Sequence, residues 1–155
     1  MLLINGCAEP QFGFRGYTDL SNCRNVIDAE LAGGSKFEEF IDADLARGDG
    51  VATQLRGELF SVPVNIFVSC YGSGGVDGVD YIAETVDFDT SGSYFAKMAN
   101  ELDAIFGEPQ QIFAAESRTR IYLCGDPATV VLREAMHGEM DFEVSLLVVP
   151  RFVEC

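Results

Sequence analysis

Acidic side chains dominate the residues that could do chemistry in this chain. Six of them fall in two short stretches of the sequence: Asp87, Asp89, Glu134, Glu139, Asp141 and Glu143. Paired carboxylates can transfer protons or bind hard cations. Their spacing matches no calcium loop, and a chain with 25 acidic residues brings such pairs together by chance. We therefore expect a solvated acidic surface and no metal site, with a small carboxylate-dependent hydrolase as a weaker alternative.

Two other features of the sequence are candidates for catalysis. His137 is the only histidine, so every mechanism that needs an imidazole must use it, yet it lies in the predicted turn MHGEM. The glycine-rich loop 71–78, YGSGGVDG, matches neither G-x-G-x-x-G nor the lysine-bearing P-loop, and a strand rather than a helix should follow it. Ser73 also lacks the G-x-S-x-G spacing. We expect no catalytic residue and no cofactor.

The segment FEEFIDADLARGDG, residues 37–50, suggests a partner-binding surface. Ser35 and Glu38 have the spacing of a capping box, which predicts a helix over residues 36–47. On that helix Glu38, Glu39 and Asp42 would form one acidic face, opposite the phenylalanines. Glu38 and Asp42 would repel each other at a cost of about 0.2 to 0.5 kcal/mol. An uncompensated cost of this kind favours a binding role.

The net charge points in the same direction. Ten Lys and Arg against 25 Asp and Glu give −15, well beyond the magnitude of about 2 to 8 that suits a small domain. Such a surface repels nucleic acid and anionic membranes and attracts basic proteins. Solubility alone is the competing explanation for this charge.

The leading hypothesis is a non-catalytic acidic protein that inhibits or neutralises a basic partner. Immunity proteins, antitoxins and nucleic-acid mimics act in this way on toxins or nucleic-acid-processing enzymes. The residues expected to contact the partner are Glu38, Glu39, Asp42, Asp77, Asp80, Asp87 and Asp89. The alternative is an acidic chaperone or adaptor that holds an extended segment of a secreted protein on an exposed sheet edge or apolar patch. The chain itself would be a monomer or a small homo-oligomer, and the alternative requires a dimer.

The cysteines and the N-terminus predict a compartment. The five cysteines have no C-x-x-C spacing and are odd in number: Cys7, Cys23, Cys70, Cys124 and Cys155. This pattern favours free thiols in a reducing compartment, with Cys70 and Cys124 as small core residues. The N-terminus lacks the features of a signal peptide, and no apolar run reaches 18 residues. We expect a bacterial cytoplasmic protein.

The elements that must position these residues are readable from periodicity. Helical patterns cover residues 18–31, 36–47 and 94–106, the last with Ser93 as its cap and Gly107 as its end. Strand patterns cover residues 51–60, 62–70, 81–88, 111–115, 119–124, 129–136 and 140–149. They predict a single α+β domain over residues 1–155, with two or three helices on one face of an antiparallel, meander-rich sheet.

A short internal match also suggests a duplication. The predicted helix 36–47 and the strand NIFVSC at residues 65–70 parallel the helix 94–106 and RIYLC at residues 120–124. Coincidence is the alternative interpretation of so short a match.

Overall fold

The computed structural model describes residues 14–17, 20–42, 50–85, 87–123, 128–138 and 141–150, with the backbone alone for 39–42 and 50–52. Its elements in chain order are α1 Cys23–Ala32, β1 Lys36–Asp42, β2 Gly50–Leu59, β3 Val62–Tyr71, β4 Val76–Thr85, α2 Phe88–Phe106, β5 Gln110–Ala114, β6 Ser117–Leu123, β7 Thr129–Met136 and β8 Phe142–Val149. The mixed α+β class predicted from the sequence is confirmed.

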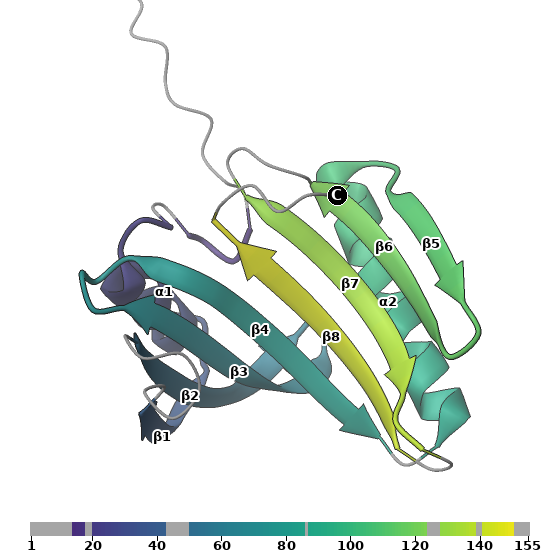
Figure 1. Cartoon of the computed structure of the whole chain (residues 1–155), viewed down its shortest axis with the longest axis horizontal. Coiled ribbons are helices and arrows are strands. Elements are labelled where there is room, and N and C mark those ends of the chain that lie inside the picture. Colours follow the sequence, from purple (N-terminus) through teal and green to yellow (C-terminus); the bar gives the residue numbers. More distant parts are fainter. Residues whose placement is uncertain are drawn as a thin grey trace, which may run out of the picture.

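All eight strands form one antiparallel sheet in the order β1-β2-β3-β4-β8-β7-β6-β5. Each half of the sheet is a meander of four strands, and β4 pairs with β8 where the two halves meet (Figure 1). The predicted meander of the last three strands, β6-β7-β8, is confirmed. This order places β1 and β5 at the two edges of the sheet.

The core lies on one face of the sheet because the strands alternate with a period of two. In β3 the side chains of Val62, Val64, Ile66 and Val68 are buried, whereas those between them are exposed or half-buried. Across the sheet, Ile66 lies opposite the buried Tyr81. The same alternation continues through β8 and β7, so one continuous apolar layer faces the helices.

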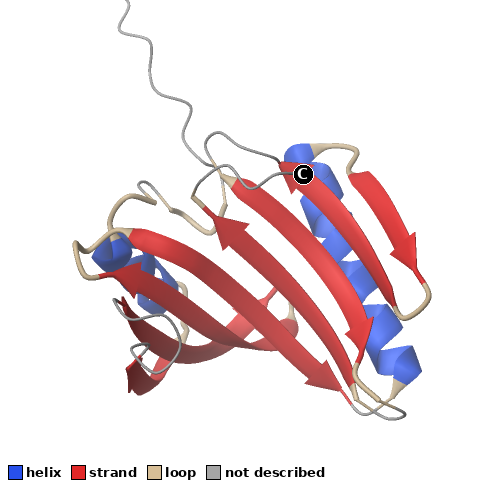
Figure 2. Ribbon diagram, in the orientation of Figure 1, coloured by secondary structure: helices blue, strands red, loops and turns tan. Residues whose placement is uncertain are grey.

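Helix α2 covers this layer and contacts β3, β4, β6, β7 and β8 (Figure 2). Its buried stripe, which includes Phe95, Met98 and Leu102, follows the predicted apolar face. The helix begins earlier than predicted, at Phe88, because the side chain of Asp87 rather than Ser93 caps it. It ends at Gly107, as predicted, where a φ of 84° suits glycine.

Helix α1 is shorter than predicted and is covalently attached to the sheet. The side chain of Asn22 caps it by accepting a hydrogen bond from the backbone N–H of Arg24. Cys23, in its first turn, forms a disulfide with Cys70 of β3. The expectation of free thiols is therefore wrong for this pair, because folding brings together two cysteines that are distant in the sequence. Cys7, Cys124 and Cys155 lie outside the described residues.

The predicted acidic helix over residues 36–47 is wrong where the structure describes it. Residues Lys36–Asp42 form strand β1, which pairs with β2 from Lys36 opposite Arg56 to Asp42 opposite Val51. Pairing with the sheet overrides the short apolar spacing that had suggested a helix. The internal match compared this segment with the helix 94–106, and the two segments differ in secondary structure. The duplication itself stays a prediction. Residues 43–49 lie outside the described part of the chain.

Candidate functional site

The structure does not bring the predicted partner-binding residues together. On β1, Glu38 forms an ion pair with Arg56 of β2 at 3.1 Å and accepts a hydrogen bond from Gln54. Glu39 and Asp42 belong to the same strand, and their side chains lie outside the described part. Because β1 is a strand, these three residues do not form the face of a helix.

Two further predicted residues lie on β4, well away from the start of α2. Asp77, near the β3–β4 turn, accepts a hydrogen bond from the hydroxyl of Tyr71 at 2.6 Å. Asp80 is half-buried in the middle of the sheet, opposite Phe67 and Leu147. At the rise of a strand, Asp77 lies about 26 Å from Thr85, the last residue of β4. The predicted set is therefore dispersed over the molecule.

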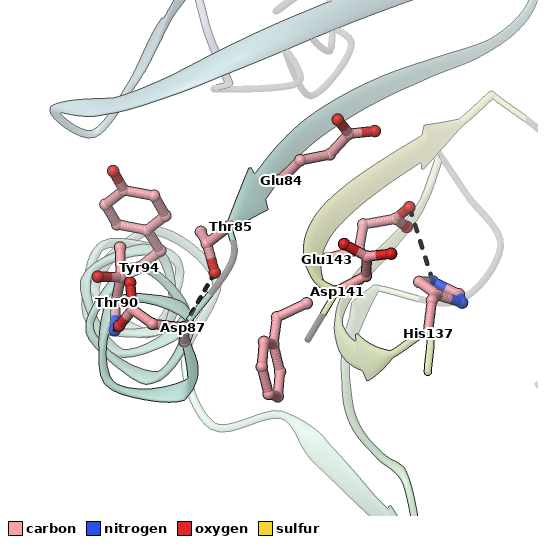
Figure 3. Close-up of a pocket in the computed structure, with 9 residues that line it drawn as sticks. Glu84, Thr85, Asp87, Thr90, Tyr94, His137, Asp141 and Glu143 are labelled. Carbon is pink, nitrogen blue, oxygen red and sulfur yellow. Dashed lines mark hydrogen bonds and ion pairs between the residues drawn. The ribbon is translucent and has the colours of Figure 1, made fainter. Parts of the chain in front are cut away.

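Asp87 belongs instead to an open cavity of about 650 Å³ that we call the acidic hollow (Figure 3). The end of β4, the start of α2 and the turn between β7 and β8 surround it. Its lining residues are Glu84, Thr85, Asp87, Thr90, Tyr94, His137, Asp141, Phe142 and Glu143. Asp89, the last predicted residue, is exposed in the first turn of α2 and does not belong to this lining.

Two hydrogen-bonded turns fix the shape of the acidic hollow. On one side Thr85 donates its hydroxyl to the backbone oxygen of Asp87 at 3.0 Å, and Asp87 accepts from the backbone N–H of Thr90 at 2.7 Å. Hydrogen bonds to the side chain and the backbone of Thr90 hold the pKa of Asp87 below its usual range. On the other side, the backbone N–H of His137 donates to the backbone oxygen of Asp141 at 2.7 Å.

The charges of the acidic hollow are poorly balanced. Glu84 and Glu143 lie directly opposite each other on β4 and β8, an arrangement of like charges that destabilises a sheet. Asp87 and Asp141 add two more carboxylates to the lining. Among the described lining residues only His137 can carry a positive charge, and its Nε2 lies 3.8 Å from a carboxylate oxygen of Glu143 (Figure 3). The site therefore concentrates negative charge.

An aromatic pair separates the acidic hollow from a second, apolar one. The rings of Phe88 and Phe142 meet edge to face with centroids 5.8 Å apart. Phe142 lines both cavities, and Phe88 lines only the second, which has a volume of about 510 Å³. We call this second cavity the apolar groove. Its remaining lining residues are Phe113, Ala114, Ala115, Glu116, Ser117, Arg118, Glu134, Ala135 and Met136.

The apolar groove exposes large side chains to solvent. Phe113 is 74% exposed, Phe88 66% and Met136 38%. Beside them, Arg118 forms an ion pair with Glu134, which also accepts a hydrogen bond from the buried hydroxyl of Ser91. Exposed aromatic and methionine side chains next to charged ones are typical of protein–protein contact surfaces.

A third constellation is buried and lines neither cavity. The carboxylate of Glu30 on α1 accepts hydrogen bonds from Arg15, Tyr17, Ser35 and Tyr81. Burial opposes ionisation of Glu30, but the hydrogen bonds from Arg15 and the two tyrosines outweigh it and lower its pKa. Burial also raises the pKa of Tyr81. With these partners satisfied, the cluster attaches α1 to β4 and is structural.

The sequence alone did not reveal the acidic hollow. Glu84 and Glu143 become neighbours only through the pairing of β4 with β8, which the sequence does not specify. The sequence places Asp141 and Glu143 in one acidic cluster and contains no signal that connects this cluster to Asp87. In the described part of the chain, no group of His, Cys, Asp and Glu side chains is arranged to hold a metal ion.

Comparison with protein-family models, curated proteins and solved structures finds no match to this chain. Within the residues that the structure describes, no helix has the length and apolar character needed to cross a membrane.

Proposed function

We propose that this chain is a non-catalytic acidic protein that binds a basic protein partner, such as a toxin or a nucleic-acid-processing enzyme, and neutralises it. The observation that carries the proposal is the like-charge pair of Glu84 and Glu143 inside the acidic hollow. Cross-strand repulsion costs stability, and a lysine or arginine side chain from a partner would relieve it. A cytoplasmic location stays a prediction. The Cys23–Cys70 disulfide removes the argument for it that was based on free thiols.

The neighbouring apolar groove supports a protein partner over a small cation. Exposed Phe88 and Phe113 offer the aromatic anchors that dominate binding energy at protein interfaces. The partner would place a cationic side chain in the acidic hollow and an apolar side chain in the apolar groove. These two side chains would lie on opposite sides of the Phe88–Phe142 pair. The net charge of −15 would accelerate the encounter with such a partner.

The test is capture of basic proteins from a lysate of the source organism at low salt. The hollow variant carries Glu84→Gln, Asp141→Asn and Glu143→Gln. A matched control removes the same charge from exposed sites on α1, β2 and α2 through Asp28→Asn, Glu58→Gln and Glu101→Gln.

We expect wild type and control to retain the same basic protein and the hollow variant to lose it. Equal capture by all three proteins would show that the acidic hollow does not bind the partner. Equal loss in both variants would show that the charge acts only in bulk. Capture of no basic protein by the wild type would remove the proposal.

The second candidate, an acidic chaperone or adaptor for a secreted protein, draws on the apolar groove alone. That role requires a dimer, so light scattering of the purified chain separates the two. A monomer that captures a folded basic protein supports the first function, whereas a dimer that captures an unfolded one supports the second.

A further inference from the structure

The two edges of the sheet differ in how they are protected. On β1, KFEEFID, four of the seven residues are charged and the register shifts between Phe37 and Glu39. Charges and bulges are the usual devices that stop a sheet edge from pairing with another strand. On β5, QQIFA, no residue is charged or a proline, and the register with β6 runs unbroken from Gln110 to Ala114. Within Gln110–Ala114, β5 has neither device, and the proline and charges near it, Glu108, Pro109 and Glu116, lie outside the strand.

The side chains of β5 are also accessible. All five of its residues are exposed, including Ile112 at 46% and Phe113 at 74%. Because neighbouring residues of a strand point to opposite faces, these two apolar side chains flank the edge on both sides. Phe113 is part of the apolar groove, which places that groove beside any strand added to β5.

Charge selects the kind of strand that fits. Exposed Glu108 and Glu116 stand two residues before and two residues after β5. A second copy of the chain, paired antiparallel about Ile112, would place each Glu108 opposite the other copy's Glu116 and would bring together two chains of net charge −15. A segment with basic residues at its ends would instead find an opposite charge at each end of β5.

We propose that β5 binds a partner by strand addition, and that the occupant is an extended apolar segment flanked by lysine or arginine. Main-chain hydrogen bonds to the outer edge of β5 supply affinity, and the side chains on the groove side contact Phe113. The basic flanks meet Glu108 and Glu116. The inference rests on the proposed function for the basic character of the partner, whereas the strand addition itself depends only on β5.

The probe is a blocked synthetic peptide, Lys-Thr-Val-Thr-Val-Thr-Val-Lys, titrated against the full chain by NMR. The comparison peptide has the same core between two glutamates. We expect the lysine-flanked peptide to bind about tenfold more tightly, with shifts at β5. Binding weaker than about 1 mM, or equal affinity for the two peptides, would overturn the proposal.

Backbone methylation separates strand addition from side-chain contact. N-methyl groups on the three threonines block one edge of the peptide, and those on the three valines block the other. One of these two peptides should lose binding and the other should keep it. If both methylated peptides lose binding, or both keep it, pairing through one edge of the peptide is contradicted. This experiment needs no variant of the protein.

Variants of Phe113 give an independent readout. Phe113→Lys and Phe113→Glu should both weaken peptide binding about tenfold, because each removes the aromatic contact. The controls Asn100→Lys and Asn100→Glu change the same charge at an exposed site on α2. If the Phe113→Glu variant binds the lysine-flanked peptide more tightly than the wild type does, electrostatic attraction alone explains the binding of the peptide. A wild-type dimer that Phe113→Lys dissociates would assign the edge to a second copy and overturn the proposal.

The hollow variant distinguishes failure of this inference from failure of the proposed function. Its three substitutions leave β5 intact, so it should keep the methylation pattern even where it no longer captures a basic protein. If the wild type captures its partner through the acidic hollow but does not bind the peptide, the proposed function stands and the strand addition is contradicted.

Discussion

Replacing Glu84 with glutamine should make the protein more stable, which is unusual for a substitution in a sheet. Glu84 lies directly opposite Glu143 across the β4–β8 pair. The variant removes the repulsion between them and keeps the shape of the side chain. Cross-strand pairs are worth about 0.2 to 1 kcal/mol, so the free energy of unfolding should rise by that amount. For a domain of this size the melting temperature should rise by about 0.5 to 4 °C.

The assay is urea unfolding at low and at high salt. Because ions screen charges over about 3 Å at 1 M salt, the gain from Glu84→Gln should appear at low salt and largely disappear at high salt. The control is Glu58→Gln, an exposed glutamate on β2 that lies opposite Pro63 rather than another acid. An equal gain in the control, or a loss of stability in Glu84→Gln, would refute the repulsion argument.

Three further predictions concern the half of the protein that contains α1 and strands β1 to β4. Glu30→Ala should cost about 3 to 5 kcal/mol in urea unfolding, because it removes the carboxylate that Arg15, Tyr17 and Tyr81 share as an acceptor. Since the folded pKa of Glu30 is lowered from 4.5, its contribution is complete above about pH 4.5 and is lost as the pH falls through the folded value. The wild type should therefore lose stability in acid more steeply than the variant, and parallel acid curves would contradict this. Reduction of the Cys23–Cys70 disulfide should lower the free energy of unfolding by about 2 to 4 kcal/mol; an oxidised and a reduced sample of equal stability would show that the bond constrains nothing.

Periodicity predicted the elements that pack against the core. The alternation from Val62 to Cys70 and the apolar stripe around Met98 are long enough to identify β3 and α2. The helix predicted for residues 36–42 is wrong because a few apolar positions fit both a helix and a strand. Only pairing with β2 decides between the two. Short segments at a sheet edge are the hardest to assign for this reason.

The candidate site depends on contacts that are distant in the sequence. Asp87 was identified, but the structure gives it a helix-capping role as well as a place in the acidic hollow. Glu84 was not selected, because its repulsion with Glu143 exists only once β4 and β8 pair. The Cys23–Cys70 disulfide was missed for the same reason. Composition predicted the sign of the surface charge, but only the fold decides where that charge is concentrated.

The central claim is that negative charge gathered in the acidic hollow binds cationic side chains. The most direct measurement is an NMR titration of the ¹⁵N-labelled chain with trilysine at low salt, using backbone amides as local reporters. The account predicts saturable shifts concentrated at Thr85, His137 and Glu143, and their loss in the hollow variant. Weak shifts spread evenly over the acidic surface, and unchanged in that variant, would contradict it.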